Sequence, residues 1–303
     1  MIYSLQRIYS QLLDREFRIL DVAIKNIDRY EYIPLEIFIE ELQLPRKVIS
    51  EGLEKLTNLK LLVRDPSGVP RYRLTFSGLS ISALRRLANR GVISALGGVI
   101  GVGKESVVYL GKNSNDNYVA IKIYRVGFKS FRHFKRKRSY AYELGGSQWL
   151  LRSIASSERE YYIFNRLSEI KVSVPKPYSR ELNALVMEYI DGVELYRLRN
   201  LRDPRRILYS ILDNIRRAYT VAGVVHMDLS AYNIMVRNPE TSDEDICIFD
   251  WPQWISVEDP GHERYLMRDL DYIIRFFRNR FEIKDITLSK AYEYVTGRSH
   301  SIE

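Results

Sequence analysis

Cysteine is nearly absent from this chain, which has one, Cys247, in 303 residues. A single cysteine excludes an intrachain disulfide, so stability has to come from a hydrophobic core, as in proteins of reducing compartments. Cys247 lies in the apolar run ICIFD at residues 246–250. We expect it to be a small buried side chain rather than a reactive thiol.

Long hydrophobic runs are also missing. Residues 1–16 lack the apolar segment that is typical of a signal peptide. The longest apolar stretch, residues 91–103, is interrupted by glycines and is too short to cross a bilayer. We therefore expect a cytoplasmic protein with no membrane contact. The 46% hydrophobic content still allows a sizeable core and excludes global disorder.

Acidic residues are the minority, with 38 Asp and Glu against 47 Lys and Arg, and the net charge is +9. A solvated basic surface would explain this balance, and so would a polyanionic partner such as ATP or RNA. One segment favours the partner, because residues 125–138 hold seven basic residues and no acidic one. The seven are Arg125, Lys129, Arg132, Lys135, Arg136, Lys137 and Arg138.

Residues 1–90 predict a winged helix, a variant of the helix-turn-helix. The pattern indicates three helices, the second at 35–42 and the third after Pro45, and then short strands at 61–64 and 72–74. The expected apolar positions are Leu5, Ile8, Leu12 and Leu13 in the first helix and Val48, Leu53 and Leu56 in the third. Basic residues at 46, 47, 55 and 60 are compatible with nucleic-acid contact or with a solvated helix face.

The rest of the chain alternates strands and helices, which predicts an α+β fold. We expect a helix at 80–90 that stops at Gly91, and then the start of a second domain. Further strands are expected at 107–110, 118–124 and 185–190, and further helices at 156–167, 204–222 and 262–280. The last helix should bury Leu266, Leu270, Ile273, Ile274, Phe277 and Phe281.

A glycine-rich string, GVGKESVVY at residues 101–109, follows the phosphate-covering loop of kinases, with Ser106 in place of the third glycine. Glycine lets the backbone approach a phosphate closely. Residues 98–104 also fit the opening of a Walker A loop. That motif needs Ser or Thr next and then a helix, whereas Glu105 and a strand follow here. The expected nucleotide contacts are Gly101, Gly103, Lys104, Glu105, Ser106 and Val108.

The tetrapeptide VAIK ends at Lys122, which is the position of the kinase lysine that pairs with the α- and β-phosphates. A glutamate on the next helix normally orients that lysine. The helix SSEREYYIFNRL offers Glu158 and Glu160. Glu160 is favoured because it precedes a core-like run, and Glu158 reads as an exposed charge.

A third string, HMDLSAYN at residues 226–233, matches the kinase catalytic loop H-x-D-L-x-x-x-N. Asp228 would orient or deprotonate the nucleophile, and Asn233 would hold a magnesium ion. His226 reads as a structural residue that packs the loop. Asp250, which ends an apolar strand before Trp251, stands where kinases place their metal-binding aspartate. The catalytic set is therefore Asp228, Lys122 and Asp250, with Asn233 and Asp250 as metal ligands.

Adenine is expected to lie against the strand at 185–190, with Met187 at the pocket wall and backbone groups of Glu188 and Ile190 nearby. Met187 as simple core filler is the alternative. Only 53 residues follow Asp250, and no A-P-E string is present. We therefore expect the chain to lack the region on which ordinary kinases select extended peptides.

Beyond the glycine-rich string, VAIK, the catalytic-loop string and the Asp250 segment, the sequence resembles the RIO-type atypical protein kinases. The similar subfamily is the one that carries an N-terminal winged helix. The resemblance covers nearly the whole chain. It rests on IGVGKES, RVGFKSFRHFKRKRSY, EREYYIFNRL, VPKPYS, VMEYIDG, HMDLSAYNIMV, IFDWPQW and RDLDYIIRFFRNRF. It implies a winged helix at 1–90, a trimmed two-lobed kinase domain at 91–283, with lobes of about 91–187 and 188–283, and a tail at 284–303.

The resemblance also implies an activity and partners. The family binds ATP and Mg²⁺ and acts in late maturation of the small ribosomal subunit, and its metal-binding aspartate, here Asp250, becomes transiently phosphorylated. We expect contact with the subunit precursor and its RNA through the winged helix and the basic segment 125–138, and a monomer when free. Departures from the family pattern are Met227, Ala231 and Ser139. None of them replaces a catalytic residue.

Two other functions stay open at this point. A small-molecule phosphotransferase would share the Asp228, Asn233 and Asp250 pattern, although the winged helix and the basic segment argue against it. A DNA-binding regulator whose kinase half only senses ATP is the third hypothesis. Crosslinking to DNA rather than to ribosomal RNA would favour that regulator.

Overall fold

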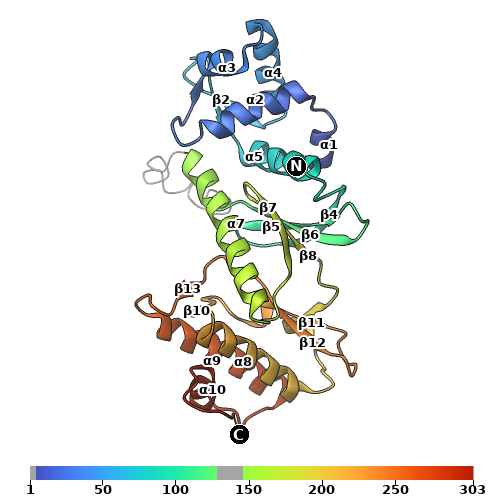
Figure 1. The fold of residues 1–303 in the computed structure, drawn as a ribbon, viewed down its shortest axis with the longest axis vertical. Helices are drawn as coiled ribbons and strands as arrows, with labels where there is room; N and C mark the ends of the chain where they lie inside the picture. Colours follow the sequence, from blue (N-terminus) through green and yellow to red (C-terminus); the bar gives the residue numbers. More distant parts are fainter. Residues whose placement is uncertain (1–4, 128–145, 303) are drawn as a thin grey trace. The chain divides into compact units, whose positions relative to one another are not determined.

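The structure is a computed structural model that describes residues 5–127 and 146–302 (Figure 1). It divides into two compact units. The first unit comprises Met1–Glu158 and Tyr178–Met187, and the second comprises Arg159–Pro177 and Glu188–Glu303. The order of elements is the predicted one: a winged helix, a sheet, and then a largely helical part. No helix in the described part of the chain is long and apolar enough to cross a membrane.

The winged helix opens the first unit. Its helices are α1 (Leu5–Tyr9), α2 (Asp14–Lys25), α3 (Leu35–Leu42), α4 (Arg46–Asn58) and α5 (Phe76–Asn89). Its small sheet has the order β1 (Ile33–Pro34), β3 (Arg71–Leu74) and β2 (Leu62–Arg64), all antiparallel. The wing is therefore the hairpin β2–β3, as predicted.

Two details of the predicted winged helix are wrong. The first predicted helix ends at Tyr9, before Leu12 and Leu13, and the unpredicted α2 starts after Leu13, whose N–H donates to Glu16 Oε2 at 2.7 Å. Leu13 is 58% exposed in consequence. In α4 the buried position is Ile49 rather than Val48. Lys55, one of the predicted basic positions, pairs at 3.2 Å with the fully buried Glu16, and nucleic-acid contact by this helix stays a prediction.

The first unit also contains a five-stranded sheet. Its order is β4 (Ala95–Val102), β5 (Ser106–Lys112), β6 (Tyr118–Tyr124), β8 (Ala184–Glu188) and β7 (Pro177–Glu181). Helix α7 (Gly146–Glu169) is longer than predicted and contains the boundary between the units. The glycine after α5, Gly91, has φ +68°, which is the conformation expected of a helix-ending glycine.

One hydrophobic core joins the winged helix to this sheet, running from Leu5 to Val186. Polar contacts reinforce it. Arg86 of α5 bonds Asp21 of α2 at 2.7 Å and Glu181 of β7 at 3.1 Å. The buried Asn183 Nδ2 donates to Ser80 Oγ at 3.0 Å and to the Tyr124 carbonyl at 2.9 Å. The winged helix and the sheet are thus packed as one body.

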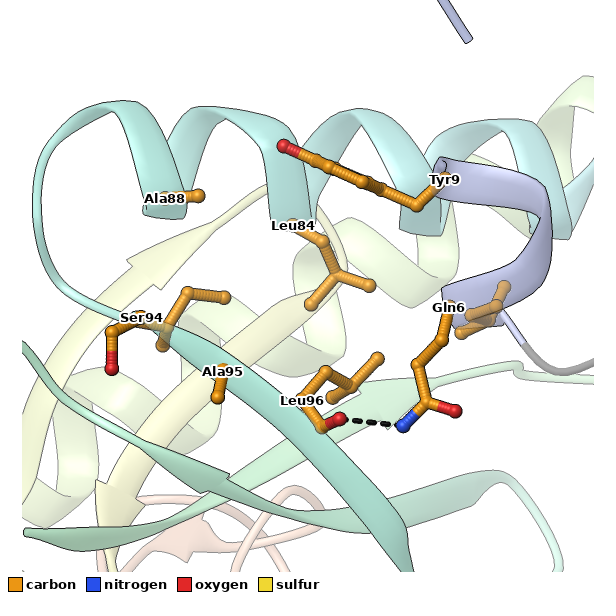
Figure 2. A pocket seen from close by; sticks show the side chains of 9 residues that line it. Gln6, Tyr9, Leu84, Ala88, Ser94, Ala95 and Leu96 are labelled. Atoms are coloured by element: carbon orange, nitrogen blue, oxygen red, sulfur yellow. Dashed lines mark hydrogen bonds between the residues drawn. The ribbon is translucent and has the colours of Figure 1, made fainter. Parts of the chain in front are cut away.

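A cavity of about 250 Å³ lies among α1, α5 and the start of β4 (Figure 2). At its edge Gln6 Nε2 donates to the carbonyls of Leu96, at 2.5 Å, and Gly97, at 2.9 Å. Strand β4 shifts register against β5 between Leu96 and Val99. The N-terminal helix therefore holds the irregular part of the strand that leads into the glycine-rich turn.

The second unit is built around two small sheets. One has the order β12 (Asp245–Ile248), β11 (Ile234–Arg237) and β9 (Val193–Glu194), and the other pairs β10 (Val224–Val225) with β13 (Ile255–Ser256). Short 3₁₀ turns are η1 (Leu195–Arg197) and η2 (Ala231–Asn233). The buried Cys247 lies in β12, where burial raises the pKa of its thiol to about 12, as expected of an unreactive core residue.

Three helices complete this unit: α8 (Pro204–Thr220), α9 (His262–Phe281) and α10 (Leu288–Val295). The predicted apolar face of α9 is confirmed at five positions, Leu266, Leu270, Ile273, Ile274 and Phe277, and Phe281 is half-buried. Helix α10 was not predicted. It buries only Ala291 and Val295 and packs against α8 and α9, so its sequence pattern is weak and its stability depends on those neighbours.

Candidate active site

The glycine-rich string forms a tight turn between β4 and β5. Gly103 N–H donates to the Ser106 carbonyl at 2.9 Å, and Arg125 N–H donates to the Glu105 carbonyl at 2.6 Å. Lys104 and Glu105 are exposed at the tip. Because β5 starts at Ser106, the strand-turn-strand interpretation is confirmed and a Walker A helix is excluded here. A Cβ at Gly103 would lie 3.3 Å from Ser106 Oγ, so the turn leaves little room for a side chain.

Lys122 lies on β6, opposite Val108 in the β5–β6 register. Its side chain is buried, with Nζ 5.2 Å above the Tyr124 ring. Val108 in turn pairs with Gly101 across β4. Met187, on the neighbouring strand β8, is buried as well. The first unit therefore places the glycine-rich turn, the lysine and Met187 on one sheet.

The catalytic-loop string in the second unit closes on itself. Asn233 Nδ2 donates to the Asp228 carbonyl at 2.7 Å, and Phe249 N–H donates to the Asn233 carbonyl at 2.9 Å. These bonds bring the Asp228–Asn233 loop beside the segment that carries Asp250. Asp228 itself is exposed, as a group that meets a substrate must be. Since the Asn233 amide nitrogen is turned to the loop, its Oδ1 is the atom left for a ligand.

His226 is buried and serves the loop's conformation. Its Nδ1 accepts the Asp228 N–H at 3.3 Å, so the ring proton belongs on Nε2, which donates to the Phe249 carbonyl at 3.0 Å. The ring also packs against Trp251, with 4.5 Å between centroids. This is the structural role expected from the sequence, because both ring nitrogens hold backbone groups of the two strings.

Two residues of these strings have left-handed backbone conformations that no sequence pattern indicated. Met227 has φ +70° and Asp250 has φ +68°. Such conformations cost non-glycine residues about 1 kcal/mol or more and persist where the surroundings enforce them. At Met227 the carbonyl accepts a hydrogen bond from the Arg268 guanidinium of α9.

Asp269, next to Arg268 on α9, was also missed. It is 1% exposed and lies beneath the catalytic loop. Burial raises the pKa of its carboxyl to about 6, although the Arg268 guanidinium and the backbone N–H groups of Leu229 and Met227 lower it. Asp269 lies on α9, about 40 residues after the catalytic loop in the sequence, and reaches the loop only through the fold. A local sequence motif could therefore not reveal its role.

Glu160 is fully buried on α7, and its Oε1 accepts the Trp251 N–H at 2.7 Å. The side chain thus holds the residue directly after Asp250. Glu158, by contrast, is 65% exposed and pairs with Arg180 at 3.8 Å, as expected of a surface charge. Lys122 belongs to the first unit and Glu160 to the second, so a pairing between them stays a prediction.

Arg159 is a site residue that sequence reasoning did not find. Its Nη2 donates to the Trp254 carbonyl at 2.5 Å and its Nε to the Pro252 carbonyl at 3.3 Å, and Trp254 Nε1 donates to the Arg159 carbonyl at 3.3 Å. Through Glu160 and Arg159, helix α7 therefore bonds the backbone of three residues after Asp250, at positions 251, 252 and 254.

The expected adenine contacts after Met187 are backbone groups. Glu188 N–H donates to the Lys176 carbonyl at 2.8 Å, and the Glu188 carboxylate meets Lys176 N–H and Arg237, each at 3.2 Å. The N–H and the carboxylate of Glu188 are therefore already engaged within the protein. Ile190 N–H has no hydrogen-bond partner among the described residues.

One carboxylate and one amide oxygen, from Asp250 and Asn233, are the hard oxygen donors that Mg²⁺ prefers, since this ion usually takes few protein ligands and completes its shell with waters and phosphates. The donor set fits that ion. Within residues 5–127 and 146–302, no group of three or more His, Cys, Asp or Glu side chains could hold a metal by itself. Most of the basic segment 125–138 lies outside the described residues.

Comparison with known proteins gives two family matches, the RIO domain over residues 107–290 and the Rio2 N-terminal domain over residues 9–90. The RIO-type serine/threonine-protein kinase Rio2 of Methanocaldococcus jannaschii is 30% identical over 88% of this chain and 98% of its own length. Rio2 of Schizosaccharomyces pombe is 28% identical over 89% and 77%. RIO2 of Saccharomyces cerevisiae is 33% identical over 70% of this chain, which covers 50% of that protein.

Solved structures of Rio2 kinases have the same fold as this chain. The Rio2 kinase–ADP/Mg²⁺–phosphoaspartate complex from Chaetomium thermophilum superposes with a TM-score of 0.84 at 24% identity, covering 98% of this chain and 94% of that one. Another crystal structure of that Rio2 kinase gives 0.82 at 25% identity, covering 97% and 93%. The chain belongs to the RIO family of serine/threonine protein kinases, in its Rio2 branch.

Proposed function

We propose that this protein is an ATP- and Mg²⁺-dependent kinase and ATPase that acts in maturation of the small ribosomal subunit. The observation that carries the chemical part is the bonded unit formed by the Asp228–Asn233 loop and the Asp250 segment. It offers an exposed carboxylate at Asp228 and two oxygen donors, at Asn233 and Asp250, on a scaffold fixed from α7 and α9.

The residues divide the work by their chemistry. Lys122 and the backbone of the glycine-rich turn bind phosphates, and the backbone at 188–190 beside Met187 binds adenine. Magnesium held by Asn233 and Asp250 would neutralise phosphate charge. Asp228 orients the nucleophile and accepts its proton. In the alternative step that the phosphoaspartate of the Chaetomium relative suggests, a carboxylate oxygen of Asp250 attacks the γ-phosphorus. The bond from that phosphorus to the β–γ bridging oxygen breaks and ADP leaves, and water later hydrolyses the acyl phosphate to restore the carboxylate and release phosphate.

The cellular assignment rests on the family. We propose a cytoplasmic protein, monomeric when free, whose partners are the small-subunit precursor and its RNA, contacted by the winged helix and the basic segment 125–138. A DNA-binding regulator is less well supported. The exposed face of α4 carries Glu51 and Glu54 besides Arg46 and Lys47, and Lys55 is engaged by Glu16. That mixed face suits duplex phosphates poorly.

The test compares Asp228→Ala with Asp250→Ala. Asp228→Ala should keep nucleotide affinity within about threefold and lower turnover by roughly 10²–10⁴-fold, which is the contribution of general acid–base catalysis. Asp250→Ala should instead weaken magnesium-dependent nucleotide binding, because an anionic ligand is lost. ATP turnover and magnesium titrations measure both effects, with purified small-subunit precursors and a generic protein as alternative stimulants.

Equal turnover by Asp228→Ala and the parent would refute the catalytic assignment. A magnesium titration unchanged in Asp250→Ala would remove that residue from the metal site. Stimulation by generic protein but not by ribosomal particles would leave the kinase intact and refute its cellular role. A small-molecule phosphotransferase would instead show turnover that neither protein nor particle increases.

A further inference from the structure

Two tyrosines stack on the surface of the second unit beside the catalytic loop. Tyr232 lies between Asp228 and Asn233 and is 64% exposed. Its ring packs on that of Tyr196 in η1, with 4.3 Å between centroids and 33° between planes. The backbone of η2 is fixed by Ser230, whose carbonyl accepts the Asn233 N–H at 3.0 Å. Tyr232 therefore leans on Tyr196 and presents most of its surface to solvent.

Neither the fold nor the phosphoryl-transfer chemistry explains this aromatic side chain. Leu229, Ala231 and Ile234 supply the buried contacts of the loop, each being 5% exposed or less. The chemistry needs Asp228 and Asn233 at their spacing, and it places no demand on the residue before Asn233. An aromatic ring held rigidly in the open is suited to contact with a partner.

Positive charge surrounds the pair. The Arg197 guanidinium lies 5.4 Å from the centre of the Tyr196 ring, and its Nε donates to the Tyr196 hydroxyl at 2.8 Å. Arg280, at the end of α9, donates to the Tyr196 carbonyl at 3.4 Å. We call Tyr196, Arg197, Tyr232 and Arg280 the tyrosine platform. The acidic residue against it is Glu194, which pairs with Arg197 at 2.6 Å.

The two segments that meet at the platform hold a large surplus of cations. Residues 195–206 have five arginines and one aspartate, and residues 275–284 have four basic residues and one glutamate. Four of these nine cations pair with carboxylates: Arg197 with Glu194, Arg205 with Asp285, Arg206 with Glu244 and Arg275 with Asp271. The other five have no ion-pair partner among the described residues: Arg199, Arg202, Arg278, Arg280 and Lys284.

We propose that the tyrosine platform binds single-stranded RNA, with an unstacked base on the open face of Tyr232 and the neighbouring phosphates on the arginines. Stacking on exposed aromatic rings beside Arg side chains is how proteins hold single strands without pairing to them. A duplex keeps its bases stacked internally and could use only the charges. An acidic peptide could likewise use the charges and would gain little from the ring.

The test measures RNA binding by the full-length protein without nucleotide, so it does not depend on phosphoryl transfer. Fluorescence anisotropy of a labelled oligouridylate, and of a hairpin duplex of equal length, compares the parent with Tyr232→Leu, Tyr232→Phe, Tyr196→Leu and Arg280→Gln. Tyr118→Leu is the matched control, since Tyr118 is 57% exposed and lies 5.5 Å from Lys112 Nζ in the first unit.

Either leucine variant should weaken oligouridylate binding roughly tenfold, corresponding to one lost base stack. Tyr232→Phe should stay within about twofold, since it keeps the ring. Arg280→Gln should lower the log–log salt slope by about 0.7. The control and all duplex affinities should change less. Irradiation of the parent with a 4-thiouridine strand should crosslink the peptide that contains Tyr232, which tests the proposal even if a variant folds poorly.

Four results would overturn the proposal: oligouridylate affinity unchanged in both leucine variants, an equal loss in Tyr118→Leu, a crosslink map that omits the Tyr232 peptide, or variants that lose an acidic peptide but keep the oligouridylate. The last result would identify the platform as a peptide site.

Discussion

Asp269 shows how one buried carboxyl can tie the catalytic loop to α9. It is nearly inaccessible, and burial raises its pKa to about 6 despite the opposing Arg268 guanidinium. The folded protein therefore holds the proton of Asp269 more tightly than the unfolded chain, where the ordinary value is 3.8. The contribution of this group to stability is greatest below about pH 4 and is lost as the pH rises to about 6.

We predict that Asp269→Asn removes this pH dependence, because an amide does not titrate. The difference in unfolding free energy between parent and variant should change by roughly 2 kcal/mol between pH 4 and pH 7, with the parent losing stability relative to the variant. Urea denaturation at a series of pH values measures it. A difference that is constant over this range would mean that Asp269 has an ordinary pKa.

At the residue scale, the sequence allowed the choice between candidate side chains but did not reveal hydrogen bonds between residues far apart in the chain. The choice of Glu160 over Glu158 followed from the apolar run after it, and the burial of the two side chains agrees with that choice. The bond from Trp251 N–H to Glu160 links residues 91 positions apart. No local pattern encodes such a contact, and the same holds for Arg268 and the Met227 carbonyl.

At the scale of elements, α7 fixes the backbone of the segment that follows Asp250. Two adjacent side chains of the helix, at 159 and 160, bond the backbone of residues 251, 252 and 254. Because Asp250 has a left-handed φ, its carboxylate direction depends on the residues that follow being held. The helix therefore helps to position Asp250, the proposed metal ligand, by holding the residues that follow it.

We predict that Arg159→Ala raises the magnesium concentration needed for half-maximal ATP turnover by about tenfold, which corresponds to roughly 1.4 kcal/mol. The melting temperature should fall only slightly, because the guanidinium is exposed. Arg166→Ala is the control, since Arg166 is exposed on the same helix and bonds only the Tyr162 hydroxyl, at 3.4 Å. An equal magnesium requirement in both variants would show that α7 does not position Asp250.

Helices and strands with a strong periodic pattern of apolar residues could be predicted. Short elements, and those whose stability depends on packing against neighbours, could not. Strand β6 matches the expected 118–124, and the face of α9 is nearly complete. The end of α1 was missed because Leu12 continues the helical spacing of Leu5 and Ile8, and α2 was not predicted. Helix α10 was missed because its two buried residues make no stripe.

At the scale of the whole chain, the predicted division at residue 90 stays a prediction about sequence families, and the matched Rio2 N-terminal domain also ends there. Packing does not follow it. A single core and the Asn183–Ser80 bond join the winged helix to the five-stranded sheet. This packing could not be foreseen, because it joins residues 103 positions apart and no local pattern links them.

We predict that Asn183→Ala lowers the opening free energy of amides in α5 and in β8 together, by about 2 kcal/mol in each. In the variant, the buried Tyr124 carbonyl loses the hydrogen bond that Asn183 Nδ2 donates to it. Native-state hydrogen exchange of the full-length protein measures both elements in one experiment. A loss confined to β8 would mean that the winged helix opens independently of the sheet.

The hydrogen bond from Gln6 to the Leu96 carbonyl (Figure 2), with a second bond to the Gly97 carbonyl, has a mechanical consequence. Strand β4 continues into the glycine-rich turn, so a displacement of α1 would be transmitted along the strand to that turn. A partner that moves α1 would therefore alter the conformation of a turn that it does not touch.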